Sequence, residues 1–296
     1  MRRESKRWLV IVSAFLTSAF CLLPSALTLA RAQVQEPSPQ YAVHAIRFAS
    51  VPYAESNLVA GGDRRKLVDI AFTFWVAQAG TRTVMVDAGF YREKFINQWQ
   101  PKSYVTPAEA LEKGLNLKPG DVTDIIVTHS HWDHIDGVDL FPKATVWIQR
   151  EEYDYYVGSS GTVAHAGGID PDDVAMMIKL NADGRVKFIN GDAREIIPGI
   201  TVYTGGKHTF ASQYAGVQTR VGTVILASDN AYLYANLERH LAIAQTLDAD
   251  SNLAAQTRML QLAASPHFVV PGHDPAVFER FPLNAPNVAR IDVPEK

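Results

Sequence analysis

The residues with the clearest chemistry form a cluster of histidine and aspartate side chains near the middle of the chain. His129, His131 and His134 lie close together in sequence, with the carboxylate of Asp133 between them. In an extended or turning backbone, residues two apart face the same side, so His129 and His131 can converge on one ion. Asp133 and His134 can then turn towards a second ion. Because imidazole and carboxylate groups are common zinc ligands, the cluster predicts a metal site.

A four-coordinate site needs more ligands than this segment offers, so the others must come from elsewhere in the chain. Three candidates each follow a predicted strand: His208, Asp229 and His273. Each of them alone is a weak signal, because an aspartate at a strand end often serves only the turn. Their shared position at strand ends makes them candidate ligands.

The elements that must position these side chains are short β-rich runs alternating with helical segments, a pattern typical of sheets covered by helices. Strands are predicted at 42–48, 70–77, 83–87, 124–128, 145–149, 187–189, 200–203, 216–221, 223–227 and 268–270. Helices are predicted at 235–247, at 252–264 and at 107–114, where Thr106 is the expected N-cap. The strand at 124–128 leads directly into the histidine cluster.

Composition indicates a globular protein and excludes some partners. The chain has 296 residues, of which 47% are hydrophobic and 20% charged, and no linker-like segment divides its interior. We therefore expect a flexible segment at 33–40 and a single catalytic domain at 41–296. The net charge of -3, without a basic run beyond the first residues, argues against a nucleic-acid partner. The oligomeric state is left open.

The N-terminus predicts export. Four basic residues open the chain: Arg2, Arg3, Lys6 and Arg7. An apolar run follows, and Ala30 and Ala32 supply the small residues that signal peptidase recognises. We expect a signal peptide at 1–32 and a periplasmic or secreted mature protein without stable membrane association. An uncleaved anchor is the alternative, because the stretch 8–30 is long enough to span a bilayer although Pro24 interrupts it.

In order and rough spacing, these motifs resemble the metallo-β-lactamase superfamily. The segment 129–134 carries the resemblance together with His208, Asp229 and His273, and Asp87 matches an earlier aspartate of the family at a strand end. The resemblance covers nearly the whole chain after residue 32. It implies an α/β fold, the αββα sandwich, in which two mixed β-sheets pack face to face between flanking helices.

The resemblance also implies two divalent metal ions and the residues that hold them. Three residues would hold the first ion (His129, His131 and His208), three the second (Asp133, His134 and His273), and one would bridge both (Asp229). A hydroxide between the ions would attack the substrate, because two cations lower the pKa of a bridging water. Asp133 would also pass a proton to the leaving group, and Asp87 would orient a ligand histidine. Zinc is the leading metal, although the same ligands accept iron, manganese or cobalt.

One further residue narrows the substrate class. Tyr232 stands three residues after Asp229, which is similar to N-acyl-homoserine lactonases, in which the tyrosine hydroxyl binds the lactone carbonyl. We therefore expect an apolar-tailed lactone as the small-molecule substrate, with packing alone as the alternative role of Tyr232. Lys207 departs from the Pro-Gly-His-Thr sequence of many family members, and it either meets an acidic substrate group or is solvated. Five aromatic residues either line a pocket for the acyl chain or fill the core: Trp99, Tyr104, Tyr153, Tyr155 and Tyr156.

Three other functions fit the same motifs. The first is a β-lactamase of the cysteine-free type, because the only cysteine, Cys21, lies in the expected signal peptide. That type generally lacks the bridging aspartate, so Asp229 counts against it. The second is a phosphotriesterase, and the third is a non-enzymatic, metal-dependent binding protein, for which a complete ligand set is unexpected.

Overall fold

The computed structural model describes residues 38–158 and 168–295, and the expected signal peptide at 1–32 lies outside these ranges. Eight strands make the first sheet: β1 (Ala42–Ala54), β2 (Leu67–Ala79), β3 (Arg82–Val86), β4 (Asp124–Ile126), β5 (Thr145–Gln149), β6 (Val186–Ile189), β12 (Leu283–Ala285) and β13 (Val288–Arg290). Their order is β12-β13-β1-β2-β3-β4-β5-β6. Pairing is antiparallel from β12 to β3 and parallel from β3 to β6, so the sheet is mixed.

Five strands make the second sheet: β7 (Arg194–Ile197), β8 (Ile200–Thr204), β9 (Gln213–Thr219), β10 (Gly222–Ser228) and β11 (Val269–Pro271). Their order is β11-β10-β9-β8-β7. Only the pair β10 and β11 is parallel, and the other neighbours run antiparallel. This sheet is therefore mixed as well, as expected for the αββα sandwich.

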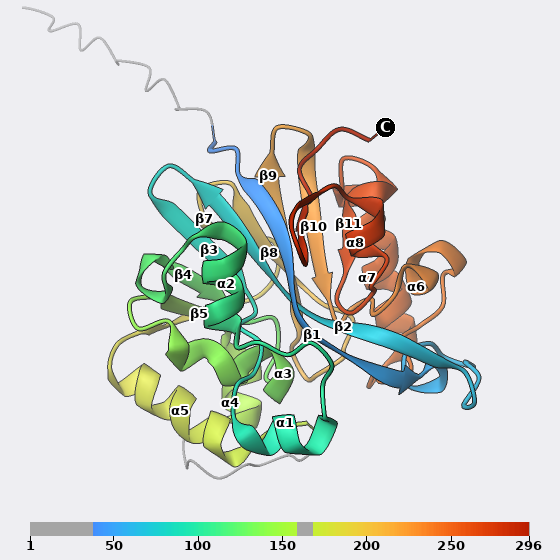
Figure 1. The fold of residues 1–296 in the computed structure, drawn as a ribbon, viewed down its shortest axis with the longest axis horizontal. Coiled ribbons are helices and arrows are strands. Elements are labelled where there is room, and N and C mark those ends of the chain that lie inside the picture. The colour runs from blue at the N-terminus through green and yellow to red at the C-terminus, as the bar shows by residue number, and fades with distance from the viewer. Residues whose placement is uncertain (1–37, 159–167, 296) are drawn as a thin grey trace, which may run out of the picture. The chain divides into compact units, whose positions relative to one another are not determined.

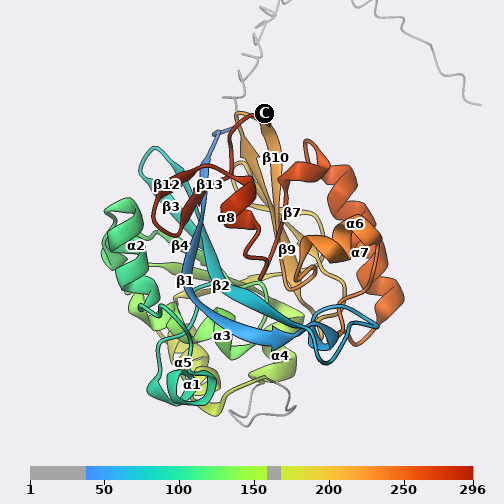
Figure 2. The ribbon, with the colours of Figure 1, turned by 45° about the vertical axis from the view of Figure 1, so that its right-hand side comes forward.

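Helices cover the outer faces of the two sheets (Figures 1 and 2). Five lie beside the first sheet: α1 (Glu93–Trp99), α2 (Pro107–Leu115), α3 (Trp132–Ile135), α4 (Arg150–Tyr156) and α5 (Pro171–Ala182). Two lie beside the second sheet, α6 (Tyr234–Arg239) and α7 (Ala249–Leu262), and α8 (Val277–Arg280) contacts β13. Short 3-10 turns occur at Glu55–Asn57, Pro119–Asp121, Asp136–Leu140 and Pro266–Phe268. In the described ranges, no helix combines the length and the apolar character needed to cross a membrane.

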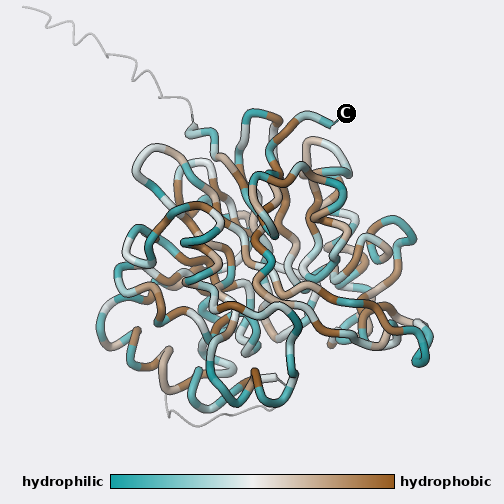
Figure 3. Tube along the Cα trace, viewed as in Figure 1, coloured by the Kyte–Doolittle hydropathy of each residue, from teal (hydrophilic) through white to brown (hydrophobic). Residues whose placement is uncertain are grey.

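The core consists of two clusters, because the central strands are buried on both faces. On β2, Phe72 and Phe74 pack into the cluster beneath the helices of the first sheet, whereas Ala71 and Trp75 pack into the cluster that the second sheet shares and that also includes residues of α6 and α7. Successive side chains of a strand point to opposite faces, so such a strand reads as a nearly continuous apolar run. Figure 3 shows hydrophobic segments along the central strands and hydrophilic ones on the outer turns.

Most predicted elements are present with shifted ends. The helix predicted at 107–114 is α2, and Thr106 caps it by accepting a hydrogen bond from Glu109 N while the Glu109 side chain accepts one from Thr106 N. The prediction had no helix at α1, α3, α4, α5 or α8 and no strand at β7, β12 or β13. These elements are short or weakly periodic, and the packing around them, rather than their own sequence, stabilises them.

The helix predicted at 235–247 is wrong in its second half. The helix α6 ends at Arg239, and His240 adopts a left-handed conformation with φ 48°. The following segment is a loop, in which Ile243 N donates to the buried side chain of Asn252 at 3.1 Å. The buried side chain of Asn236 binds carbonyl groups of the same loop. These amide side chains bind backbone groups that a continued helix would use for itself, so the apolar periodicity of the segment misleads.

Candidate metal centre

The seven predicted ligands come from four places in the fold. The loop after β4 and the helix α3 carry the cluster at 129–134, and the loop between β8 and β9 carries His208. Asp229 directly follows β10, and His273 lies two residues after β11. The structure brings the seven into two groups: His129, His131, His208 and Asp229, and separately Asp133, His134 and His273. Within each group the ligand atoms lie within 4.8 Å of one another.

The first group has the spacing of ligands around one ion. The Nδ1 atom of His131 lies 3.1 Å from His129 Nε2 and 2.9 Å from His208 Nε2. Three nitrogens bound to one tetrahedral zinc would stand roughly 3.3 Å apart. Imidazole lone pairs that converge in this way need a proton or a cation between them. The donor set therefore fits a divalent ion.

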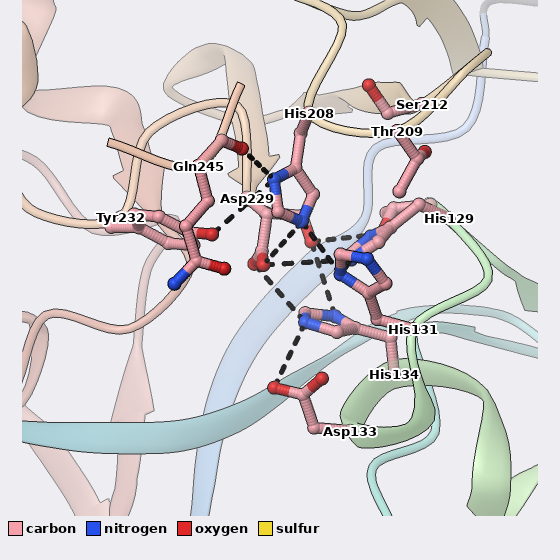
Figure 4. Close-up of polar contacts among 12 residues, drawn as sticks. His129, His131, Asp133, His134, His208, Thr209, Ser212, Asp229, Tyr232 and Gln245 are labelled. Carbon is pink, nitrogen blue, oxygen red and sulfur yellow. Dashed lines mark hydrogen bonds and ion pairs between the residues drawn. The ribbon is translucent and has the colours of Figure 1, made fainter. Parts of the chain in front are cut away.

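Asp229 lies between the two groups and presents one oxygen to each (Figure 4). Its Oδ2 is 3.2 Å from His208 Nε2 and 3.6 Å from His129 Nε2. Its Oδ1 is 3.2 Å from His134 Nε2 and 3.0 Å from His273 Nε2. In the part of the chain that the structure describes, Asp229 Oδ1 and His134 Nε2 are buried, and the close contact between them is not a hydrogen bond. A second cation held by these atoms would satisfy both, so Asp229 is placed to bridge two ions.

Three histidines are held by hydrogen bonds on the side away from the centre. His208 Nδ1 donates to Gln245 O at 2.7 Å, and His273 Nδ1 donates to Ala71 O at 3.0 Å. His134 Nδ1 contacts Asp87 Oδ2 at 2.9 Å, so Asp87 lies where the sequence predicted it. With Nδ1 protonated, the Nε2 atom of each ring is free for a metal. The partners Gln245 and Ala71 were missed because only their backbone carbonyls take part, and no residue type signals that.

Asp87 connects the two sheets beneath the ligands. Its carboxylate accepts hydrogen bonds from Thr128 N, Thr128 Oγ1 and Ser228 Oγ at 2.9–3.0 Å. Asp87 and Ser228 both have positive φ, 61° and 46°, and so does Lys207 beside His208, at 57°. Such conformations cost non-glycine residues of the order of 1 kcal/mol or more and persist where the surroundings enforce them. Ser228 and Thr128 were also missed by the sequence, although each directly precedes a ligand.

Opposite charges compensate one another among the buried groups of the centre. Burial alone would raise the pKa of Asp229, but His134, His273 and His129 outweigh it and hold that pKa well below its usual range. Burial opposes the charged form of His134, yet Asp229, Asp133 and Asp87 raise the pKa of that imidazole. Burial and the neighbouring imidazole of His134 lower the pKa of His129, so that ring stays neutral. Asp229 is thus anionic, as a bridging ligand must be.

The two groups open into a cavity of about 420 Å³. His131, Asp133, His208, Asp229 and His273 contribute to its polar part. Its apolar part is lined by Tyr53, Leu58, Ile70, Phe72, Trp99, Trp132 and Leu247. A mostly apolar cavity with a few converging polar groups is the usual form of a small-molecule site.

Of the aromatic residues proposed for this cavity, Trp99 lines it and stacks on Trp132 with ring centroids 5.5 Å apart. The pocket role is wrong for the other four. Tyr104 stacks on Phe90, Tyr153 belongs to the core, Tyr155 stacks on Phe210, and the Tyr156 hydroxyl accepts a hydrogen bond from Phe210 N. Sequence composition could not tell these positions apart because all five residues are aromatic and follow strand ends.

Tyr232 and Lys207 differ in their relation to the cavity. Tyr232 lines it, and its ring lies between His208 and His273, with centroids 5.6 Å from each. Lys207 instead donates from Nζ to Phe210 O at 2.7 Å and lies over the Phe210 ring. Lys207 therefore stabilises its own loop, and neither of the two roles considered for it describes this contact.

Gly168 touches the ligand loop from the other side. Its carbonyl oxygen accepts a hydrogen bond from Trp132 N at 3.1 Å, and its φ is +80°. A Cβ at this position would lie 2.6 Å from the His131 ring. Only glycine allows the backbone to approach the imidazole so closely.

Comparison with known proteins agrees with this geometry. The family model described as the Metallo-beta-lactamase superfamily matches residues 68–273. An N-acyl homoserine lactonase from Bacillus sp is 27% identical over 164 residues, which is 55% of this chain and 60% of the relative. The chain thus spans about 60% of the length of that curated relative.

Two solved structures share the fold. One is an N-acyl homoserine lactone hydrolase with the product N-hexanoyl-L-homoserine at its catalytic metal centre; its TM-score is 0.69 at 19% identity, covering 84% of this chain and 98% of that chain. The other is AidC, a dizinc quorum-quenching lactonase, with a TM-score of 0.64 at 16% identity, covering 88% of this chain and 96% of that chain. At such identities the likeness shows a common αββα fold.

The bridging position of Asp229 generates a prediction about metal content. Removing an outer partner of a ligand typically costs 10–100-fold in metal affinity, and we expect Asp229→Asn to cost at least about that at both ions. His273→Ala should weaken only the second ion. Elemental analysis by mass spectrometry after dialysis against a metal buffer measures the stoichiometry.

His267→Gln is the matched control for these variants. His267 is half-buried, packs on Phe281 and takes no part in either group. The His267→Gln variant should bind as much metal as the unchanged protein. Two ions of undiminished affinity in Asp229→Asn would refute the bridging role.

Proposed function

Because the chain belongs to the metallo-β-lactamase superfamily, we propose that it is a dinuclear metal-dependent hydrolase that opens the ring of N-acyl-homoserine lactones. The observation that carries the proposal is the position of Tyr232, which lines the same cavity as the ligand groups that meet at Asp229. The similar lactonases support the same substrate class. Because the sequence identity to these lactonases covers only part of the chain, the substrate is our own proposal.

We propose that the metal is zinc. His129, His131 and His208 would hold the first ion, Asp133, His134 and His273 would hold the second, and Asp229 would bind both. The imidazole and carboxylate donors support this choice, as does the dizinc state of the similar AidC. When bound, such a pair of ions supplies a water of lowered pKa and polarises the carbonyl that is attacked.

Tyr232 has the properties of a hydrogen-bond donor to a developing oxyanion. Its hydroxyl lies 3.4 Å from His208 Nδ1, but that nitrogen already donates to Gln245 O and cannot accept the tyrosine proton. Burial, followed by the charges of Asp229 and Asp133, raises the pKa of Tyr232 well above its usual range. The hydroxyl therefore keeps its proton at neutral pH. We propose that it donates this proton in a hydrogen bond to the lactone carbonyl oxygen.

Asp133 is suited to handle the proton of the leaving group. Its side chain is 15% exposed and lines the cavity, so it can reach a bound substrate. Burial raises its pKa, although the imidazoles of His134 and His273 oppose that shift. With one oxygen on an ion, the other oxygen of this carboxylate could take up a proton as the water adds and deliver it to the alkoxide that leaves when the ring opens.

The apolar wall of the cavity supports a substrate with a hydrocarbon tail. Tyr53, Trp99 and Leu247 come from three separate segments and face the same space as Tyr232. An acyl chain that covers such surfaces would gain about 0.8 kcal/mol of binding free energy for each methylene group that it buries. We therefore propose that lactones with longer acyl chains bind more tightly.

Export remains a proposal that the sequence of residues 1–32 supports. We expect the protein isolated from the producing cells to be periplasmic or secreted and to begin at Gln33. Intact-mass measurement of the purified protein tests the cleavage site. A full-length chain in the membrane fraction would favour the anchor instead, and a full-length chain in the cytosol would contradict export.

The lactonase proposal predicts the addition of one water to an N-acyl-homoserine lactone by the zinc-loaded protein. Mass spectrometry in water enriched in oxygen-18 should show one labelled oxygen in the ring-opened acid, and a chelator should abolish turnover. A β-lactam and a phosphotriester serve as parallel substrates. If a protein with two bound ions hydrolyses one of these but no lactone, the substrate proposal is wrong while the hydrolase proposal survives.

Tyr232→Phe should lower kcat while leaving metal content unchanged. Loss of one oxyanion donor costs up to about 10²–10³-fold, and since a metal shares the role we expect roughly 10-fold. Tyr234→Phe is the matched control, because among the described residues the Tyr234 hydroxyl is buried without a partner, and it does not line the cavity. Equal kinetics of the two variants would leave Tyr232 with a packing role only.

A further inference from the structure

Glu152 is a carboxylate in the core that neither the sequence pattern nor the proposed mechanism explains. It lies in α4 and is 0% exposed. A buried carboxylate is costly unless hydrogen bonds replace its water. Three uncharged donors do so: Ser130 N at 2.9 Å and Thr209 Oγ1 at 2.8 Å on Oε1, and Ala211 N at 2.8 Å on Oε2.

These donors belong to the two loops that carry the three histidines of the first group. Ser130 lies between His129 and His131, in the loop that follows β4 of the first sheet. Thr209 and Ala211 follow His208 in the loop between β8 and β9 of the second sheet. Figure 4 shows Thr209 next to His129. A single side chain thus connects the ligand loops of the two sheets.

We propose that Glu152 is a positioning residue that sets the distance between the His129–His131 loop and the His208 loop, and so the geometry and affinity of the first metal ion. The inference rests on the proposed two-metal site but on no particular substrate. His208 Nε2 stands 2.9 Å from His131 Nδ1 across the junction that Glu152 connects. A change in that junction moves one ligand relative to the other two.

Other contacts between the same segments do not involve Glu152 and should keep the fold intact when it is replaced. Gln213 N donates to Thr128 O at 2.9 Å, and the Gln213 side chain donates to Val127 O at 2.8 Å. The Tyr156 hydroxyl also accepts a hydrogen bond from Phe210 N at 3.1 Å. A loss of the Glu152 contacts should therefore affect the ligands more than the chain's ability to fold.

Glu152→Gln changes the hydrogen bonds with little change of shape. All three contacts require an acceptor, and the amide replaces one acceptor oxygen with an NH₂ donor. Whichever way the amide is turned, an N–H group then faces at least one of the donors from Ser130, Thr209 or Ala211. One of the two loops must move away.

Asp292→Asn is the matched control. Asp292 is also a buried carboxylate, 1% exposed, and accepts a hydrogen bond from a backbone amide, Val43 N, at 2.8 Å. Asp292 is also paired with the guanidinium groups of Arg290 on β13 and Arg220 in the turn between β9 and β10, and neither residue is one of the candidate ligands. Both variants thus remove a buried carboxylate, and Asp292→Asn does so away from the ligand loops, with loss of two ion pairs as well.

The experiment measures metal binding without any substrate. Zn²⁺ affinity is obtained by competition with a chromophoric chelator, and the visible spectrum of the Co²⁺-loaded protein reports ligand geometry. We expect Glu152→Gln to bind one of the two ions about 10–100-fold more weakly and to change the Co²⁺ spectrum. Asp292→Asn should match the unchanged protein in both measurements.

An unchanged affinity and Co²⁺ spectrum in Glu152→Gln would overturn the proposal, and so would equal losses in Asp292→Asn. If circular dichroism shows that Glu152→Gln does not fold, Thr209→Val takes its place, since it removes one of the three donors at constant shape. A smaller shift in the same direction is then expected, and no shift would also overturn the proposal. Failure of lactone hydrolysis leaves these readouts intact, so the two proposals fail separately.

Discussion

The buried carboxylate of Asp229 is the interaction on which the site depends. It is 4% exposed and has imidazole nitrogens 3.0–3.6 Å away on both of its oxygens. A lone anion in such a place would be strongly disfavoured, and the converging imidazoles, or the cations they would bind, make it tolerable. The fold must therefore bring the ends of β4, β10 and β11 to one point, and the positive φ angles of Asp87 and Ser228 show that the backbone bends to do so.

Two carboxylates behind the ligands give this arrangement its rigidity. Asp87 connects β3, the end of β4 and the end of β10, while Glu152 connects the loops of the two sheets from the side of α4. Both accept several hydrogen bonds at once, so neither is easily replaced by a group with fewer acceptors. The candidate ligands are thus held by polar contacts on the side away from the cavity, which is the condition for a preorganised metal site.

The sequence predicts which seven residues converge at the centre, because their chemistry is visible in residue types and because strands of buried β-branched residues mark where the chain turns. It also predicts the αββα fold, through the family resemblance. It fails where the cause is tertiary. The helix expected beyond Arg239 is replaced by a loop that buried Asn236 and Asn252 bind, and the carbonyls of Ala71 and Gln245 orient histidines without any signal in their side chains. Of five similar aromatic residues, only the packing decides that Trp99 faces the cavity.

Apart from Trp132, which lies within the ligand segment, much of the apolar cavity wall is encoded in other parts of the chain than the ligand groups. Tyr53 and Leu58 belong to the hairpin of β1 and β2, Trp99 to α1, and Leu247 to the loop before α7, whereas the ligands occupy 129–134, 208, 229 and 273. Natural selection, or a mutant library, can therefore alter the wall while the metal ligands stay unchanged. Such a division lets substrate preference diverge among descendants of one ancestor without passing through inactive forms. Trp132 and the loop around Gln245 are exceptions, because Trp132 lies between His131 and Asp133 and the Gln245 carbonyl binds His208.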